Sequence, residues 1–202
     1  NDHVNCHDKG NDQVRMVVIA LRNTPGSRCP SKNFFESADK NSNRRTIHLG
    51  VDVFCKVNTP VYCPCDGEVV FVDNCQKRLD YGGFVVLKHF TEKGSFFFSL
   101  FGHLDPNSIN LKIGQKVKKT NRLANIGSFK VNGGWEPHLH IQLSLGLGQG
   151  KNWPGVCNEK EKDFWEKYCP SPAPFLGINT KKIVPLSKKV SKLMNMPVQR
   201  NK

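Results

Sequence analysis

The sequence predicts a mainly β fold, built as an antiparallel sheet with loop-rich termini and one or two short helices. Short runs rich in β-branched and aromatic residues recur between residues 46 and 143. Turn-forming Gly, Pro, Asn and Asp separate these runs, and helical periodicity is scarce before Asn158. At 202 residues the chain is long enough to bury a core, so we expect one domain with appendages.

The first expected strand is the apolar run Met16–Leu21, which interrupts an otherwise polar and loop-like segment over residues 1–43. Further along, two apolar runs flank Glu92-Lys93-Gly94 in the pattern of a hairpin with a short loop. The strands expected after the first are Thr46–Phe54, Pro60–Tyr62, Glu68–Val72, Phe84–His89, Phe96–Phe101, Lys116–Val117, Leu123–Ile126 and His138–Leu143.

Helical signals are confined to the C-terminal end of the chain. Glu159–Tyr168 is expected to form a short amphipathic helix, which the prolines after it close, and Ser187–Met194 is a second candidate. We therefore divide the chain into four parts. These are an N-terminal extension with one strand (1–43), a β domain (44–150), a C-terminal extension packing on that domain (151–180) and a basic tail or linker (181–202).

The net charge of +13 depends strongly on the C-terminal tail. Residues 181–202 hold seven basic and no acidic side chains, and removing these seven charges from +13 leaves +6. Such a tail is typical of a solvated extension or linker; the alternative is attraction to an anionic polymer such as a cell wall or a membrane surface. The tail lacks the aromatic residues on which single-stranded nucleic acid stacks, so we expect no specific nucleic-acid partner.

The eight cysteines leave the redox compartment open. An even number permits disulfides outside the cell, but a chain of this size does not depend on them. No CxxC pair occurs, which gives a structural four-cysteine zinc site little support. Cys63 and Cys65 would share one strand face about 7 Å apart, so they are expected to pair with other partners or to stay reduced in the core.

No apolar run is long enough to span a membrane as a helix, so we expect no transmembrane segment. The chain opens on Asn1 rather than Met and shows no secretory leader, which is expected of a mature or excised piece. The localisation therefore stays open, and the even cysteine count leans toward secretion.

Histidine and aspartate recur in three β-type stretches that Gly or Pro punctuates. His48 and Asp52 lie in HLGVD, His103 lies in FGHL, and His138 and His140 lie in PHLH. Zinc binds His nitrogen and Asp oxygen in tetrahedral geometry, and a catalytic site keeps one position open for water. Three of these side chains can hold one ion, which leaves two imidazoles to handle protons and charge.

The spacing of these residues constrains the local backbone. In an extended strand His48 and Asp52 would lie about 13 Å apart, too far for one ion, so we expect a bend at Gly50. His138 and His140 project from one face of a strand. His89 ends a strand, and we expect it to face solvent or to make a local hydrogen bond.

Taken together, these segments resemble the M23 (lysostaphin/LytM-type) zinc metallopeptidase domain, from about Arg45 to Leu143. The resemblance is carried in order by HLGVDVF, TPVYCPCDGEVVFV, LKH, FGHL, LKIGQKV, NRLANIG and PHLHIQL. With GGWEPHLHIQL, NWPGV and CPSPAPFLGI, residues 44–178 look most like the version of this domain found in aminotransferase fusion proteins, which would place the chain in the cytoplasm.

The resemblance implies a LytM-like β-sheet groove with one Zn²⁺ per chain at its floor. It implies that His48, Asp52 and His140 bind the metal and that His103 and His138 act on the attacking water and the oxyanion. A vertebrate chemotaxin with the same fold resembles the chain at HLGVDVFC but lacks a full catalytic set. Phe101 stands where the family more often has Tyr.

The implied function is zinc-dependent endopeptidase activity on peptidoglycan or on glycine-rich peptides. The alternative is a catalytically idle zinc-containing binding or accessory module of a larger protein. Some aromatic residues could line the groove, namely Trp135, Trp153 and the Phe96–Phe98 cluster. The alternative is that they are ordinary core residues.

Overall fold

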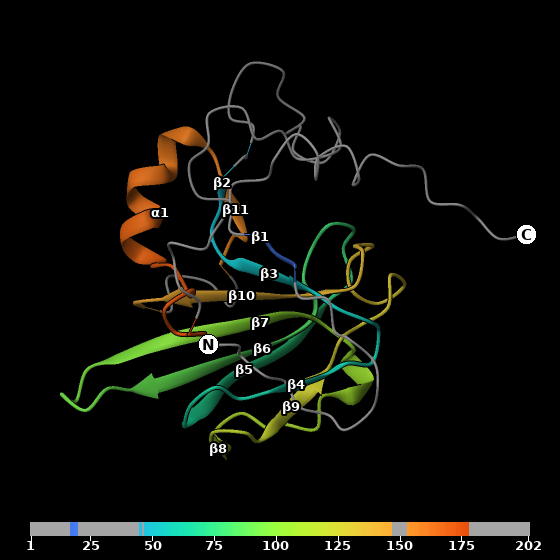
Figure 1. Cartoon of the computed structure of the whole chain (residues 1–202), viewed down its shortest axis with the longest axis horizontal. Coiled ribbons are helices and arrows are strands. Elements are labelled where there is room, and N and C mark those ends of the chain that lie inside the picture. Colours follow the sequence, from blue (N-terminus) through green and yellow to red (C-terminus); the bar gives the residue numbers. More distant parts are fainter. Residues whose placement is uncertain (1–16, 20–44, 46, 147–152, 178–202) are drawn as a thin grey trace, which may run out of the picture.

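The structure is a computed structural model that describes residues 17–19, 45, 47–146 and 153–177. Its main element is an antiparallel sheet of seven strands in the order β1-β3-β10-β7-β6-β5-β8 (Figure 1). The strands of this sheet are β1 (Val17–Ile19), β3 (Val51–Phe54), β5 (Gly67–Cys75), β6 (Gly82–Phe90), β7 (Phe96–Leu104), β8 (Lys116–Val117) and β10 (His138–Ser144). The predicted mainly β, antiparallel fold class is confirmed.

Two small sheets and a few helical turns complete the described fold. β2 (Ile47–His48) pairs with β11 (Val156–Cys157), and β4 (Pro60–Tyr62) pairs with β9 (Arg122–Asn125). The helical elements are the 3₁₀ turns η1 (Pro106–Ser108) and η2 (Glu159–Glu161) and the α-helix α1 (Lys162–Tyr168). The helix predicted over Glu159–Tyr168 is thus present as η2 followed by α1, whereas Ser187–Met194 lies outside the described residues.

The long hairpin β6–β7 forms the centre of the sheet, and β6 is buried on both faces. Its apolar run alternates between two core clusters: Val85 and Leu87 join one cluster, and Phe84 and Val86 join the other. Because successive strand residues point to opposite faces, a continuous apolar run is what a strand covered on both sides requires. The hairpin predicted around Glu92-Lys93-Gly94 is confirmed.

A third cluster joins the C-terminal extension to the main domain. Ile47, Leu49, Cys157 and Cys169 are buried together, and aromatic side chains of α1 pack against them. The helix therefore lies beside β2 and β11, on one side of the large sheet (Figure 1). In the described part of the chain no helix is both long and apolar enough to cross a membrane.

We expect Leu100→Ala to lower the free energy of unfolding by about 2–5 kcal/mol, because the side chain is fully buried and a cavity would remain. Ile113, which is 66% exposed, provides the matched control, and Ile113→Ala should change stability by less than about 0.5 kcal/mol. Denaturant unfolding of both variants checks this. Equal losses in the two variants would contradict the assignment of Leu100 to the core.

Candidate metal centre

Three neighbouring strands place the candidate site at one level of the sheet. Asp52 on β3 lies opposite His140 on β10, and His140 lies opposite Gly102 on β7. His103 follows Gly102 directly and still belongs to β7, rather than to a loop beyond it. Antiparallel pairing thus places Asp52 and His140 side by side in one row, with His103 at the next position of β7.

His48 reaches this row from β2 because the chain bends at Gly50, as predicted. The strand expected over Thr46–Phe54 is therefore broken into β2 and β3. A Cβ atom at Gly50 would lie 2.5 Å from the carbonyl oxygen of Ile141 and 2.7 Å from Cε1 of His140. Only glycine allows the backbone to pass this close to the imidazole.

One atom from each of His48, Asp52 and His140 forms a nearly equilateral triangle. Nε2 of His48 lies 3.1 Å from Nδ1 of His140 and 3.2 Å from Oδ1 of Asp52, and the last two atoms are 3.0 Å apart. A tetrahedral zinc with bonds of about 2.0 Å separates its ligand atoms by about 3.3 Å. The donor types and spacing therefore fit one zinc-sized ion, and no other such group occurs among the described residues.

The buried carboxylate and imidazole stabilise each other's charge. Burial alone would raise the pKa of Asp52, but the positive charge of His48 and hydrogen bonding with the neighbouring imidazoles hold it well below its usual range. Burial would lower the pKa of His48, but attraction to Asp52 and their hydrogen bond raise it above 6.5. Without a metal the site thus favours a proton on His48.

His103 and His138 lie directly beside the triangle. Their ring centroids are 4.3 Å apart, and Nε2 of His138 lies 3.8 Å from Oδ1 of Asp52. Each Nδ1 donates to a backbone carbonyl, that of Asn132 for His103 at 2.9 Å and that of Glu136 for His138 at 2.6 Å. Since a carbonyl only accepts, the neutral form of each ring carries its lone pair on Nε2.

Burial lowers the pKa of both rings below 6.5. For His103, repulsion from His138 and His140 lowers the pKa further, and it lies well below the ordinary value. The backbone of His103 is also in the left-handed region, with φ of 62°. Such a conformation is costly for a side chain other than glycine and is common at functional sites. The pair is therefore neutral at neutral pH and rigidly placed.

Three residues that contact this site were not predicted as site residues. The carbonyl of Asn132 holds His103, the Tyr81 ring lies 5.2 Å from that of His140, and the Gln142 amide accepts from Nε2 of His140 at 3.1 Å. Only Gln142 carried a sequence signal, because it shares a strand face with His138 and His140. Asn132 acts through its backbone, which no side-chain motif reveals.

Other sequence predictions meet mixed outcomes. His89 does not face solvent: it is 1% exposed and bonds the carbonyl of Asp66 and the hydroxyl of Ser99. Trp153 is buried in a core cluster, whereas the Trp135 ring lies 6.0 Å from that of His103. Phe101 is buried in the core. The hydroxyl of a tyrosine at this position would therefore point away from solvent.

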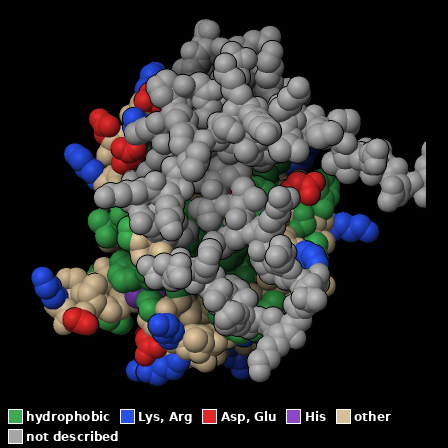
Figure 2. Space-filling view, viewed as in Figure 1, with side chains coloured by type: hydrophobic (Ala, Val, Ile, Leu, Met, Phe, Trp, Pro, Cys, Tyr) green, Lys and Arg blue, Asp and Glu red, His purple; other side chains and the backbone are tan. Residues whose placement is uncertain are grey.

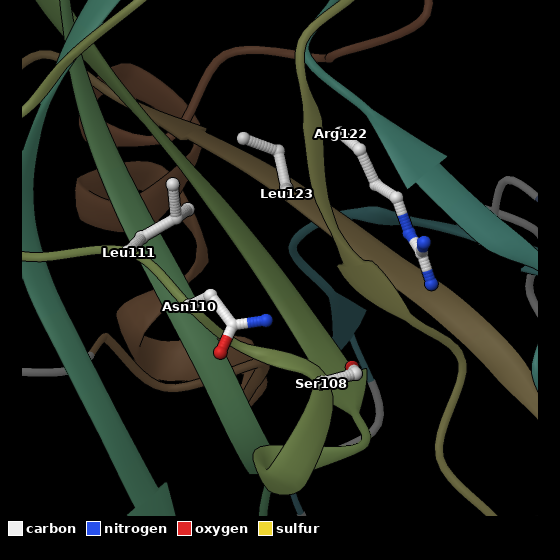
Figure 3. A pocket seen from close by; sticks show the side chains of 5 residues that line it. All are labelled: Ser108, Asn110, Leu111, Arg122 and Leu123. Atoms are coloured by element: carbon white, nitrogen blue, oxygen red, sulfur yellow. The ribbon is translucent and has the colours of Figure 1, made fainter.

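A separate pocket of about 280 Å³ lies between β9 and the chain after η1 (Figure 3). Its lining residues are Ser108, Asn110, Leu111, Arg122 and Leu123. None of them belongs to the histidine and aspartate cluster. In the space-filling view, basic and acidic side chains are spread around the rim of the face shown (Figure 2).

An antiparallel β domain with two histidines and an aspartate placed to hold one ion has the features of a metallopeptidase. The model of peptidase family M23 matches residues 46–152, more than half of the chain. The chain therefore belongs to peptidase family M23. No curated protein sequence gives a significant match.

Solved structures with a similar fold come from bacterial peptidases. The catalytic domain of lysostaphin from Staphylococcus simulans is 24% identical, with a TM-score of 0.45, over 65% of this chain and 80% of that one. A prophage-encoded M23 catalytic domain from Enterococcus faecalis is 21% identical, with a TM-score of 0.44, over 58% and 82% of the two chains. A zinc-containing peptidase from Vibrio cholerae is 26% identical, with a TM-score of 0.43, over 67% and 34%.

We expect the affinity for Zn²⁺ to rise with pH through the pKa of His48 and then to level off. The pKa of His48 is raised above 6.5, so this ring stays protonated to a higher pH than an ordinary histidine. The metal must displace that proton in order to bind. Titration calorimetry in buffers of different ionisation enthalpy should show protons released near neutral pH. Zinc binding without proton release, or binding that strengthens as pH falls, would contradict this assignment.

Proposed function

We propose that this protein is a zinc-dependent endopeptidase that hydrolyses peptide bonds in peptidoglycan or in glycine-rich peptides. The observation that supports it best is the triangle of His48, Asp52 and His140 with two further imidazoles beside it. Membership of a peptidase family makes peptide hydrolysis the natural reaction for these groups. The spacing alone is compatible with an ion of similar size, and the nitrogen-rich donor set favours zinc.

In this proposal His48, Asp52 and His140 hold one Zn²⁺ per chain. When bound, the ion lowers the pKa of a coordinated water from about 16 to near 7 and polarises the scissile carbonyl. Asp52 is ionised over the whole working range because its pKa is so low, so one negative charge always offsets the charge of the metal. At 20% exposure, its side chain is also the most accessible of the three.

His138 and His103 handle the proton. With Nδ1 of each ring donating to a backbone carbonyl, both neutral rings offer a lone pair on Nε2. His138, whose Nε2 is the nearer to Asp52, accepts the proton from the attacking water and passes it to the leaving amine. The proton taken from the water could equally reside on Nε2 of His103, from where it would be donated to the developing oxyanion. Because protonation of one ring disfavours the other, the pair holds a single proton at a time.

Aromatic side chains frame His138 on two sides. The Phe54 ring stacks on it with centroids 5.0 Å apart, and the Trp135 ring meets it edge-on at 6.2 Å. These rings keep the imidazole in place and lower the local polarity. They form the proposed wall of a LytM-like groove for an extended peptide.

The proposal extends to the organisation of the chain. Residues 44–150 would form the peptidase domain, with residues 1–43 and 151–180 as extensions on either side. Residues 181–202, outside the described part, would serve as a linker or bind an anionic polymer such as a cell wall.

The competing hypothesis is a catalytically idle module of a larger protein, of the kind that the likeness to aminotransferase fusions implies. The placement of both His103 and His138 beside the triangle argues against it, because a binding module has no need of either ring. Stoichiometric zinc with no hydrolysis of pentaglycine or muropeptides would favour the idle module. The fusion origin can be tested by mass analysis of the native protein. A chain that continues past Lys202 would support it.

We expect His140→Ala to lose both zinc and activity, because it removes one of three donor atoms. His103→Ala should retain zinc and lose about 10²–10³-fold in kcat, because it removes a group that acts only on the reaction. Metal analysis and hydrolysis of pentaglycine measure both effects. If the two variants retained zinc equally, the ligand assignment would be wrong.

With Zn²⁺ kept saturating, so that protonation of His48 does not remove the metal, we expect kcat/KM to fall on the acid side only below a pH of about 6.5. The pKa values of His103 and His138 are lowered by burial, and both rings must be neutral to accept a proton. A nearby dication lowers these values further, so the sign of the shift does not change. Rate measurements across the acid range provide the test. An acid limb centred well above neutral pH would contradict the assignment of these two rings.

A further inference from the structure

Gln142 is a buried polar residue whose amide oxygen and amide nitrogen both meet polar partners. Its Oε1 faces Nε2 of His140 at 3.1 Å and the hydroxyl of Tyr81 at 3.2 Å. Its Nε2 donates to the carbonyl of Pro154 at 3.2 Å and to the sulfur of Cys169 at 3.3 Å. The side chain is fully buried, so water cannot replace any of these partners.

These contacts determine which way the amide points. A backbone carbonyl only accepts hydrogen bonds, so Pro154 must face the NH₂ group of Gln142. The amide oxygen then faces His140, and as a pure acceptor it requires a proton on Nε2 of that ring. The neutral imidazole consequently has its lone pair on Nδ1, which can accept from a protonated Nε2 of His48 at 3.1 Å and which also faces Asp52.

We propose that Gln142 is the positioning residue of the metal centre, which selects the tautomer of His140 that binds zinc through Nδ1. This inference rests on the proposed function for the identity of the metal. The direction of the amide comes from the C-terminal extension, because Pro154 and Cys169 both belong to it. The extension is therefore part of the support of the metal site.

Further contacts tie the same extension to the site. The hydroxyl of Tyr81 reaches the carbonyl of Trp153 at 2.9 Å, Val156 pairs with His48, and the amide of Leu49 donates to the carbonyl of Gly155 at 2.9 Å. Residues 153–157 thus pair with His48 directly and reach His140 through Gln142 and Tyr81. Such outer partners fix ring orientation and raise the basicity of the ligand nitrogen.

The test compares Gln142→Met, which keeps the length of the side chain but has no amide, with Gln142→Glu, which keeps an acceptor for His140. Gln115→Met is the matched control, because Gln115 is exposed and remote in sequence from the site. Three quantities are measured for each protein. These are the ring tautomer of His140 by ¹⁵N NMR of the metal-free protein at alkaline pH, the affinity for Zn²⁺ by competition with a chelator, and the thermal midpoint.

We expect the wild-type protein and Gln142→Glu to carry the His140 proton on Nε2. Gln142→Met should show a mixture of tautomers and bind zinc about 10–100-fold more weakly. The Glu variant should recover most of that affinity, and the control should match the wild type. Recovery by the Glu variant separates positioning from a general loss of packing, which both substitutions would share.

A wild-type His140 with its proton on Nδ1 would overturn the inference, even if Gln142→Met failed to fold. A folded Gln142→Met with wild-type tautomer and wild-type affinity would overturn it as well. If the wild-type protein bound no zinc, the proposed function would fail, whereas the tautomer spectra would still decide the role of Gln142.

Discussion

The candidate site depends on one constraint: atoms of His48, Asp52 and the distant His140 must lie about 3 Å apart in a buried place. Two features satisfy it together. The register of β3, β10 and β7 brings Asp52 beside His140, and the bend at Gly50 turns His48 back toward them. A slip of one residue in either strand pair would turn its side chain to the opposite face of the sheet. The two-faced core around β6 holds that register in place.

The electrostatics of the cluster follow from its burial. A buried carboxylate is costly unless it is paired and hydrogen-bonded, and Asp52 has imidazole partners within reach of a single oxygen. In the metal-free protein a proton on His48 supplies the compensating charge. In the proposed function, a dication bound by the same three side chains would supply more positive charge, so proton and metal would compete for one position. The lowered pKa values of His103 and His138 leave these rings outside that competition.

The C-terminal extension lies close to the chemistry rather than at the periphery. β11 pairs with the strand that carries His48, and the carbonyl of Pro154 contacts the amide that faces His140. α1 covers the cluster formed by Ile47, Leu49, Cys157 and Cys169. A domain boundary drawn at the last histidine would therefore remove groups that pair with His48 and with Gln142.

The sequence by itself determined the mainly β class, most strand positions, the hairpin around Gly94 and the need for a bend at Gly50. Each depends on local properties, namely alternation of apolar residues, turn chemistry and the reach of an extended chain. It also singled out the five histidine and aspartate side chains that the fold brings together. Only the tertiary structure decided the burial of His89, the backbone carbonyls that orient His103 and His138, and the contacts of Gln142. These depend on which strands pair and in what register, and such long-range choices leave no local pattern in the chain.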